Sequence, residues 1–207
     1  MIGELIERYP KLSCCEKEII NARDTIIQCY KNGGKLLLCG NGGSCADCDH
    51  IVGELMKGFL LKRPLSEEKK HEILKKSPSV SDDTLNKLQG SLPAISLPSF
   101  TALNTAFSND VDADLIYAQG VLGLGSNGDV LIALSTSGNS KSVLEAAKIA
   151  RAKGLRVITL TGGDGGKLRD FSDVCIAVPE NETYKVQELH LPIYHWLCAE
   201  VEEYFFG

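Results

Sequence analysis

Five short runs of apolar residues, separated by longer segments with helical spacing, constrain the fold of this 207-residue chain more than any other feature. The runs lie at 35–39, 94–97, 130–134, 157–160 and 174–178. Runs that are apolar throughout, rather than at every second position, are typical of parallel strands covered on both faces. Because helical patterns alternate with these runs, the sequence predicts an α/β fold with a doubly wound, five-stranded parallel sheet.

The helical patterns divide the rest of the chain. One or two helices are predicted over 2–31, a helix over 141–153 that Gly154 ends, and a long C-terminal helix over 186–206 that contains Pro192 near its first turns. The length and a 43% hydrophobic composition fit a single domain spanning 1–207. The helices at the two ends of the chain are expected to flank the sheet.

A charged insertion at 61–92 interrupts this alternation. It is rich in Lys, Glu and Asp and is punctuated by Pro64 and Pro78. A helix is predicted from Ser66 to Lys76, with Ser66 as its N-cap. We expect the insertion to be a solvated excursion on the surface, and a lid or a subunit contact is its functional alternative.

Charge and hydropathy exclude several classes of partner. The formal net charge of -5 weighs against a nucleic-acid backbone as the main partner. No apolar run approaches the roughly 20 residues of a membrane span, and residues 1–12 lack the apolar core of a signal peptide. We therefore expect a cytoplasmic protein without membrane or nucleic-acid partners. In a reducing compartment its cysteines are expected to be buried thiols, among them Cys29, Cys39, Cys175 and Cys198.

Two loops with anion-binding residues follow predicted strands and begin predicted helices. The first is GNGGS at 40–44 and the second is STSGNS at 135–140. Glycines permit close backbone approach, helix N-termini offer free N–H groups, and hydroxyls add donors, so together the loops predict a phosphorylated small molecule. The first loop lacks the dinucleotide fingerprint, since Cys45 stands at the third glycine position. Taken alone, it could be a tight turn without a ligand.

Two predicted helices carry side chains suited to proton transfer or metal binding. His50 and Glu54 are four residues apart and share one face of a helix that starts at Ser44 or Cys45. Gln187 and His195 are eight residues apart and lie on nearly one face of the last helix. The four side chains could coordinate one metal ion, or they could supply a general base and acid beside a bound sugar.

Neighbouring polar residues are given structural roles. Cys45 and Cys48 form a C-x-x-C pair, but no second pair with zinc spacing follows, so we expect them to pack the helix against the sheet. His190 lies on another side of its helix and is expected to be structural. Three acids of that helix are expected to be solvated: Glu188, Glu200 and Glu202.

Taken together, these motifs resemble the phosphoheptose isomerases, a family of the sugar isomerase (SIS) superfamily. The resemblance rests on GNGGS at 40–44, His50 with Glu54, ND at 109–110, STSGNS at 135–140, ITLTGGDGGKL at 158–168 and QELH…H at 187–195, and it covers nearly the whole chain outside 61–92. It implies a flavodoxin-like fold and a homotetramer with sites at subunit interfaces. The implied reaction converts sedoheptulose 7-phosphate into D-glycero-D-manno-heptose 7-phosphate.

The resemblance also assigns roles to residues. Glu54 matches the base that moves a proton between C1 and C2 through an enediol, and His195 matches the partnering acid. Some members bind zinc, and His50, Glu54, Gln187 and His195 match the ligands, so that one zinc per subunit is expected and the base and ligand roles of Glu54 compete. The implied substrate contacts are Asn41, Gly42, Gly43, Ser44, Glu54, Asn109, Asp110, Ser135, Thr136, Ser137, Ser140 and Gln187.

Two departures from the family pattern bear on the substrate. The insertion at 61–92 is longer than the usual connection, and Tyr184 stands where a small or acidic residue is expected, so the preference for a heptose stays open. The second reading is a non-catalytic SIS module that senses a sugar phosphate or binds a protein partner. The acid–base side chains favour the enzyme, because a sensor does not need them.

Overall fold

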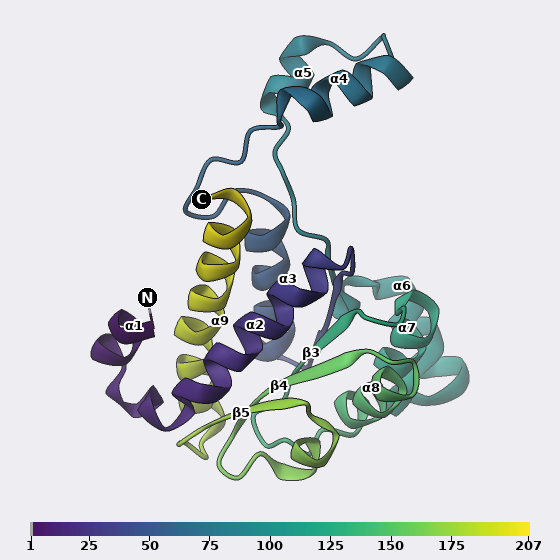
Figure 1. Ribbon diagram of the computed structural model, residues 1–207. Coiled ribbons are helices and arrows are strands. Elements are labelled where there is room, and N and C mark those ends of the chain that lie inside the picture. The colour runs from purple at the N-terminus through teal and green to yellow at the C-terminus, as the bar shows by residue number, and fades with distance from the viewer. Residues whose placement is uncertain (1) are drawn as a thin grey trace.

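The computed structural model describes residues 2–207 and shows helices on both faces of a five-stranded sheet (Figure 1). The strands are β1 (Leu36–Gly40), β2 (Ala94–Ser96), β3 (Val130–Leu134), β4 (Arg156–Gly162) and β5 (Val174–Val178). Their order is β2-β1-β3-β4-β5, and all neighbours are parallel. The predicted apolar runs coincide with these strands, so the predicted doubly wound, flavodoxin-like sheet is confirmed.

The helices follow the predicted pattern with small shifts. Their bounds are α1 (Ile2–Arg8), α2 (Glu16–Lys31), α3 (Gly43–Met56), α4 (Glu67–Lys76), α5 (Asp82–Lys87), α6 (Thr101–Phe107), α7 (Ile116–Leu124), α8 (Lys141–Ala152) and α9 (Thr183–Phe206). A 3₁₀ turn at Pro10–Cys15 separates α1 from α2. Because α9 begins three residues before the predicted start, Pro192 lies well inside it.

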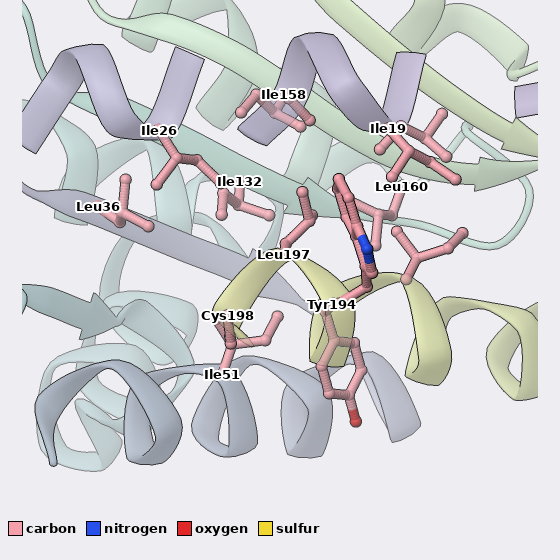
Figure 2. Packing of buried hydrophobic residues seen from close by; sticks show 14 of the residues in the cluster. Ile19, Ile26, Leu36, Ile51, Ile132, Ile158, Leu160, Tyr194, Leu197 and Cys198 are labelled. Carbon is pink, nitrogen blue, oxygen red and sulfur yellow. The ribbon is translucent and has the colours of Figure 1, made fainter. Parts of the chain in front are cut away.

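Alternate residues of each strand face two separate halves of the core. Leu36 and Leu38 of β1 pack with α2, α3 and α9, whereas Leu37 of the same strand packs with α7 and α8. Figure 2 shows part of the first half, in which Ile26 of α2 and Leu197 of α9 meet the side chains of β1 and β3. Every residue of β1 and β3 is buried, as expected for central strands covered on both faces.

The insertion projects from this body. In Figure 1, α4 and α5 stand apart from the sheet at the end of two extended segments. Ser66 caps α4 as predicted, since its hydroxyl accepts a hydrogen bond from the backbone N–H of Lys69 at 3.2 Å. No residue of α4 is buried, so this part is the expected solvated excursion. The root of the insertion differs, because Arg63 is only 1% exposed.

The predicted solvation of Glu202 is wrong. Its side chain is fully buried and accepts hydrogen bonds from the backbone N–H groups of Phe59, Leu60 and Leu61, and from Arg63 Nε at 2.6 Å. These four donors satisfy a carboxylate that could not otherwise be buried. Of the other two acids, Glu188 is exposed, whereas the half-buried Glu200 lies 3.6 Å from Arg23.

The cysteines are free thiols within the described residues 2–207. Cys29, Cys39 and Cys198 are buried as predicted, whereas Cys175 is only half-buried. None of the helices over these residues has both the length and the apolar character needed to cross a bilayer.

Candidate active site

Both predicted anion-binding loops lie at one edge of the sheet. β1 and β3 are neighbours, and Gly40 pairs with Leu134, so the two loops leave the sheet at the same level. β2 lies on the other side of β1, which means that the strand order reverses between β1 and β3. In a 2-1-3-4-5 sheet this switch point forms the ligand crevice at the carboxyl ends of the strands.

The glycine loop is shaped for close approach. Gly42 has a φ of +58°, a backbone conformation that disfavours other residues. Gly43 faces Gln187 of α9, and a Cβ at Gly43 would lie 2.5 Å from Gln187 Nε2. The missing side chain therefore allows Gln187 to rest directly on the start of α3. No side-chain hydrogen bond caps α3 at Gly42, and the N–H groups of Ser44 and Cys45 donate to the backbone carbonyls of Asn41 and Gly42 at 3.1 and 3.0 Å.

A side-chain amide connects the two loops. Asn41 Nδ2 donates to Ser140 Oγ at 2.8 Å and to Ser142 Oγ at 3.0 Å. On the other side, the single hydroxyl proton of Tyr117 is shared between two acceptors, the Gly40 carbonyl at 2.8 Å and Asn41 Oδ1 at 3.0 Å. Sequence reasoning missed Ser142 and Tyr117. Ser142 follows the STSGNS motif directly, whereas no sequence signal links Tyr117 to this loop.

The loop at 135–140 packs closely against the loop that follows β4, and the Leu168 N–H donates to the Gly138 carbonyl at 2.9 Å. Gly138 has a φ of +64°, and a Cβ there would overlap the carbonyl oxygen of Gly165. Ser137 Oγ accepts from the Asn139 backbone N–H at 3.2 Å, and Ser135 is buried. Ser140 stands at the N-cap of α8 but makes no capping hydrogen bond with its side chain. The N-terminus of α8 is therefore a second helix end that can receive an anion.

Three of the side chains predicted for proton transfer or metal binding converge from α3 and α9. His50 Nε2 lies 3.4 Å from Glu54 Oε1 and 3.4 Å from His195 Nε2. The ring of Phe59 lies beside His195, with 5.7 Å between the ring centroids. Lys57 Nζ is 3.5 Å from the other oxygen of Glu54. The structure thus brings together three of the four residues predicted for proton transfer or metal binding.

Burial sets the protonation of His195. It lowers the pKa of His195, the neighbouring His50 lowers it further, and Glu54 opposes both, so the net direction is downward. A lowered pKa favours the neutral imidazole near neutral pH, which carries one N–H donor and one free lone pair. A neutral ring can both give and receive a proton.

The distances around His50 match those of a metal site in part. Zinc at about 2.0–2.2 Å from tetrahedral ligands places those ligands roughly 3.4 Å apart. His50 has this separation from both Glu54 and His195. In residues 2–207, however, no group of three or more His, Cys, Asp or Glu side chains is arranged to hold a metal ion. The fourth candidate, Gln187, lies against Gly43. The His50–Glu54 and His50–His195 distances each suit two zinc ligands, and the complete four-ligand site stays a prediction.

Cys45 and Cys48 are free thiols on α3. Cys48 is fully buried, and burial holds its pKa well above the usual thiol value. Burial and the neighbouring Asp49 also raise the pKa of Cys45. The packing role predicted for the pair therefore agrees with the burial of Cys48, whereas for the half-buried Cys45 it stays a prediction.

Asn109 and Asp110 lie in the segment between α6 and α7. They belong to a π-helical turn at Ser108–Asp112 that follows α6. Asn109 Nδ2 donates to Asp110 Oδ1 at 2.8 Å, and over the described part of the chain no side-chain hydrogen bond joins either residue to the two loops. Their role as substrate contacts stays a prediction. Tyr184, the departure noted above, is 56% exposed at the start of α9.

Comparison with known proteins first defines the class. Two family models described as SIS domains match this chain, one over residues 102–195 and the other over residues 12–78. The chain is 37% identical over 195 residues to the phosphoheptose isomerase of Rhodospirillum rubrum, an alignment that covers 94% of this chain and 90% of the relative. It is 39% identical over 187 residues to that of Nitratiruptor sp., with 90% and 86% covered.

Solved structures agree. The phosphoheptose isomerase of Neisseria gonorrhoeae superposes with a TM-score of 0.76 at 32% identity, over 97% of this chain and 94% of that one. The enzyme from Francisella tularensis gives a TM-score of 0.78 at 29% identity, with the same coverage. The chain therefore belongs to the phosphoheptose isomerase family of SIS-domain proteins.

Proposed function

We propose that this protein is an aldose–ketose isomerase that converts sedoheptulose 7-phosphate into D-glycero-D-manno-heptose 7-phosphate. The observation that carries the proposal is the meeting of Glu54 and His50 of α3 with His195 of α9. α3 begins at the predicted anion-binding loop 40–44, and α9 contacts the same loop through Gln187. From Ser44 to His50, α3 rises by about 9 Å. An open-chain seven-carbon sugar phosphate spans such a distance, with its phosphate at the loops and C1 and C2 near Glu54.

The proton transfers follow from this placement. Glu54 takes a proton from C1 of the ketose while His195 gives a proton to O2, which produces the enediol. Glu54 then returns its proton to C2, and His195 takes the proton from O1, which leaves an aldehyde at C1. Both residues end in their starting protonation states. Preorganised acid–base pairs of this kind contribute about 10²–10⁴-fold to a rate.

The phosphate is assigned to the two loops. Ser135, Thr136, Ser137 and Ser140 supply hydroxyls, and the first turn of α8 supplies backbone N–H groups. Asn41, Gly42, Gly43, Ser44, Gln187, Asn109 and Asp110 complete the proposed substrate contacts. In the structure the side-chain amide of Asn41 donates its two hydrogens to Ser140 and Ser142. A donated hydrogen bond from Asn41 to the substrate therefore requires one of these two bonds to break.

The proposal includes one zinc ion per subunit, bound at the cluster of His50, Glu54 and His195. His50, Glu54, Gln187 and His195 would hold it, and it would supply Lewis-acid polarisation of the sugar carbonyl. A carboxylate that binds zinc is a weaker base, so the two roles of Glu54 compete. Elemental analysis of the purified protein, with a Cys45→Ala/Cys48→Ala variant as control, decides whether zinc is bound and by which side chains.

Assembly and location complete the proposal. We place the protein in the cytoplasm as a homotetramer whose sites lie at subunit interfaces. Asn109 and Asp110 are exposed, and in residues 2–207 their side chains make no hydrogen bond to the two loops, so they are available to a second subunit. A monomer with full activity in sedimentation and kinetic measurements would contradict the interface site.

The decisive experiment replaces the base. Glu54→Gln keeps the shape of the side chain, and we expect turnover of sedoheptulose 7-phosphate to fall by about 10²–10⁴-fold with little change in sugar-phosphate binding. Ser137→Ala with Ser140→Ala should instead weaken binding first. Glu188→Gln, on the exposed face of α9, is the matched control. Near-normal turnover by Glu54→Gln removes this residue from the base role.

Measurements of turnover and binding on the wild-type protein distinguish an isomerase from a non-catalytic sensor. Isomerisation with uptake of solvent deuterium at C1 or C2 supports an enediol. Tight binding of the sugar phosphate without any turnover would support the non-catalytic SIS module, which the retained acid–base side chains do not favour.

A further inference from the structure

Tyr194 places a hydroxyl group between two side chains of α3. Its ring is 2% exposed and extends from α9 toward α3, next to the catalytic His195 in sequence (Figure 2). Tyr194 Oη lies 3.1 Å from Asp47 Oδ1 and 3.1 Å from His50 Nδ1. The reaction proposed above assigns no role to either Tyr194 or Asp47.

The chemistry of these three groups fixes the direction of the hydrogen bonds. An ionised carboxylate only accepts, so the single hydroxyl proton of Tyr194 goes to Asp47. The tyrosine oxygen then has only lone pairs left for His50, which must therefore donate from Nδ1. Asp47 depends on this arrangement, because its other oxygen is buried and has no hydrogen-bond partner in residues 2–207.

This direction has a consequence on the other side of the imidazole ring. A neutral histidine with its proton on Nδ1 carries a lone pair on Nε2. That nitrogen faces Glu54 Oε1 at 3.4 Å and His195 Nε2 at 3.4 Å. Since His50 cannot donate to Glu54, the carboxylate keeps its basicity. Two acceptors that face each other also form a place for a positive species, either a proton in transit or a metal ion.

We propose that Tyr194 and Asp47 form a relay that holds His50 as the Nδ1–H tautomer, and that they are positioning residues for the acid–base cluster. The positioning role rests on the proposed function, whereas the tautomer of His50 depends only on the three side chains. Buried partners that orient a histidine through its second nitrogen commonly change metal affinity by 10–100-fold when removed.

The test reads the tautomer directly. Full-length protein with ¹⁵N-labelled histidine is stripped of metal with a chelator, checked for folding, and examined by long-range ¹H–¹⁵N correlation NMR at about pH 8.5, well above the ordinary histidine pKa of about 6.5. Burial raises the pKa of Asp47 from 3.8, with Tyr194 opposing, and burial together with Asp47 raises the pKa of Tyr194. The phenol of Tyr194 therefore keeps its proton at this pH, which is also far above the ordinary carboxyl value from which the Asp47 shift starts.

Two variants remove different parts of the relay, and both are expected to move the His50 proton from Nδ1 to Nε2. Tyr194→Phe removes the acceptor at Nδ1, so Glu54 draws the proton to Nε2. Asp47→Ala leaves the tyrosine in place but frees its proton, which then goes to His50 Nδ1 and again moves the histidine proton to Nε2. Both variants should convert the His50 signals from the Nδ1–H to the Nε2–H pattern and weaken binding of Zn²⁺ alone, measured against a chromophoric chelator, by about 10–100-fold.

Tyr204→Phe is the control, because Tyr204 lies on the same helix but is 52% exposed. It should leave both the tautomer and Zn²⁺ binding unchanged. An Nε2–H pattern for His50 in the wild-type protein overturns the relay, as does an unchanged Nδ1–H pattern in either variant. A protein that shows the predicted tautomers but does not isomerise sedoheptulose 7-phosphate refutes the proposed function and leaves the relay standing.

Discussion

His190 is predicted to make this protein sensitive to mild acid. Its side chain is fully buried on α9, Nε2 lies 3.2 Å from the Thr161 carbonyl, and Nδ1 has no partner among residues 2–207. Burial lowers the pKa of His190 from 6.5 to about 4, and the Thr161 carbonyl opposes this only in part. Protonation in the folded state would place an unpaired charge in the core.

The sign and size of the effect follow from linkage. Because the pKa is lower in the folded than in the unfolded protein, the unfolded state binds more protons between pH 6.5 and about 4. Stability from the neutral ring is complete above pH 6.5 and is lost as the pH falls toward 4. At about 1.4 kcal/mol per pKa unit, the loss is about 2.5 kcal/mol at pH 4.5. That is a large part of a typical domain stability of about 5–15 kcal/mol.

His190→Gln isolates this contribution from that of the carboxylates. Urea unfolding at fixed protein concentration, followed by the fluorescence of the single tryptophan, Trp196, gives the free energy of unfolding at pH 7.5 and pH 4.5. At pH 7.5 the variant should be less stable, because it loses packing and weakens the bond to Thr161. At pH 4.5 the difference from wild type should be smaller by about 2.5 kcal/mol, since only the wild type has a histidine to protonate.

The exposed His71 of α4 provides the control, and His71→Gln should run parallel to wild type at both pH values. If His190→Gln also runs parallel to wild type, the buried neutral state assigned to this histidine is refuted.

Two further substitutions test packing around the site. Gly43→Ala should lower turnover by about 10²-fold with the fold retained, because its Cβ would displace the side-chain amide of Gln187, which would lie 2.5 Å away. Gly53→Ala is the control and should be active, because there is open space around Gly53. Equal activity of the two variants would contradict the close contact. Glu202→Gln should cost about 3–5 kcal/mol in urea unfolding because it leaves Arg63 buried without a counter-charge, and the exposed Glu203→Gln should cost almost nothing. A loss below about 1 kcal/mol for Glu202→Gln would mean that the buried pair does not stabilise the fold.

The fold could be predicted because its signals are local. Each strand is a continuous apolar run, and the loops at the carboxyl ends of β1 and β3 carry glycines and hydroxyls in sequence order. The pairing of His50 with Glu54 needed only helical spacing. The meeting of α3 with α9 could not be read from spacing, but residues with the same chemistry on both helices made it a reasonable prediction, and the 3.4 Å contact between His50 and His195 confirms it.

The parts that could not be predicted depend on contacts between distant segments. Glu202 looks like a surface acid in a helix rich in acids, and its burial depends on backbone N–H groups about 140 residues earlier in the chain. The sequence assigns no role to Tyr117 or Tyr194, and only the folded arrangement shows that their hydroxyls meet Asn41 and His50. Helix periodicity reports which face is apolar, but it does not report which hydroxyl finds a polar partner.

The buried Arg63 connects the insertion to the end of α3, the helix that carries the proposed base Glu54. Its guanidinium donates to the backbone carbonyls of Glu54 at 3.0 Å and Leu55 at 2.7 Å, which are the last carbonyls of α3 and have no helical partner of their own. The same guanidinium is paired with Glu202. The end of the helix that holds the proposed base is therefore fixed by the residue from which the insertion begins. The far end of the insertion is tied to the same place, because the Leu92 N–H donates to the Leu55 carbonyl at 3.0 Å and the Gly58 N–H donates to Gln89 Oε1 at 2.7 Å.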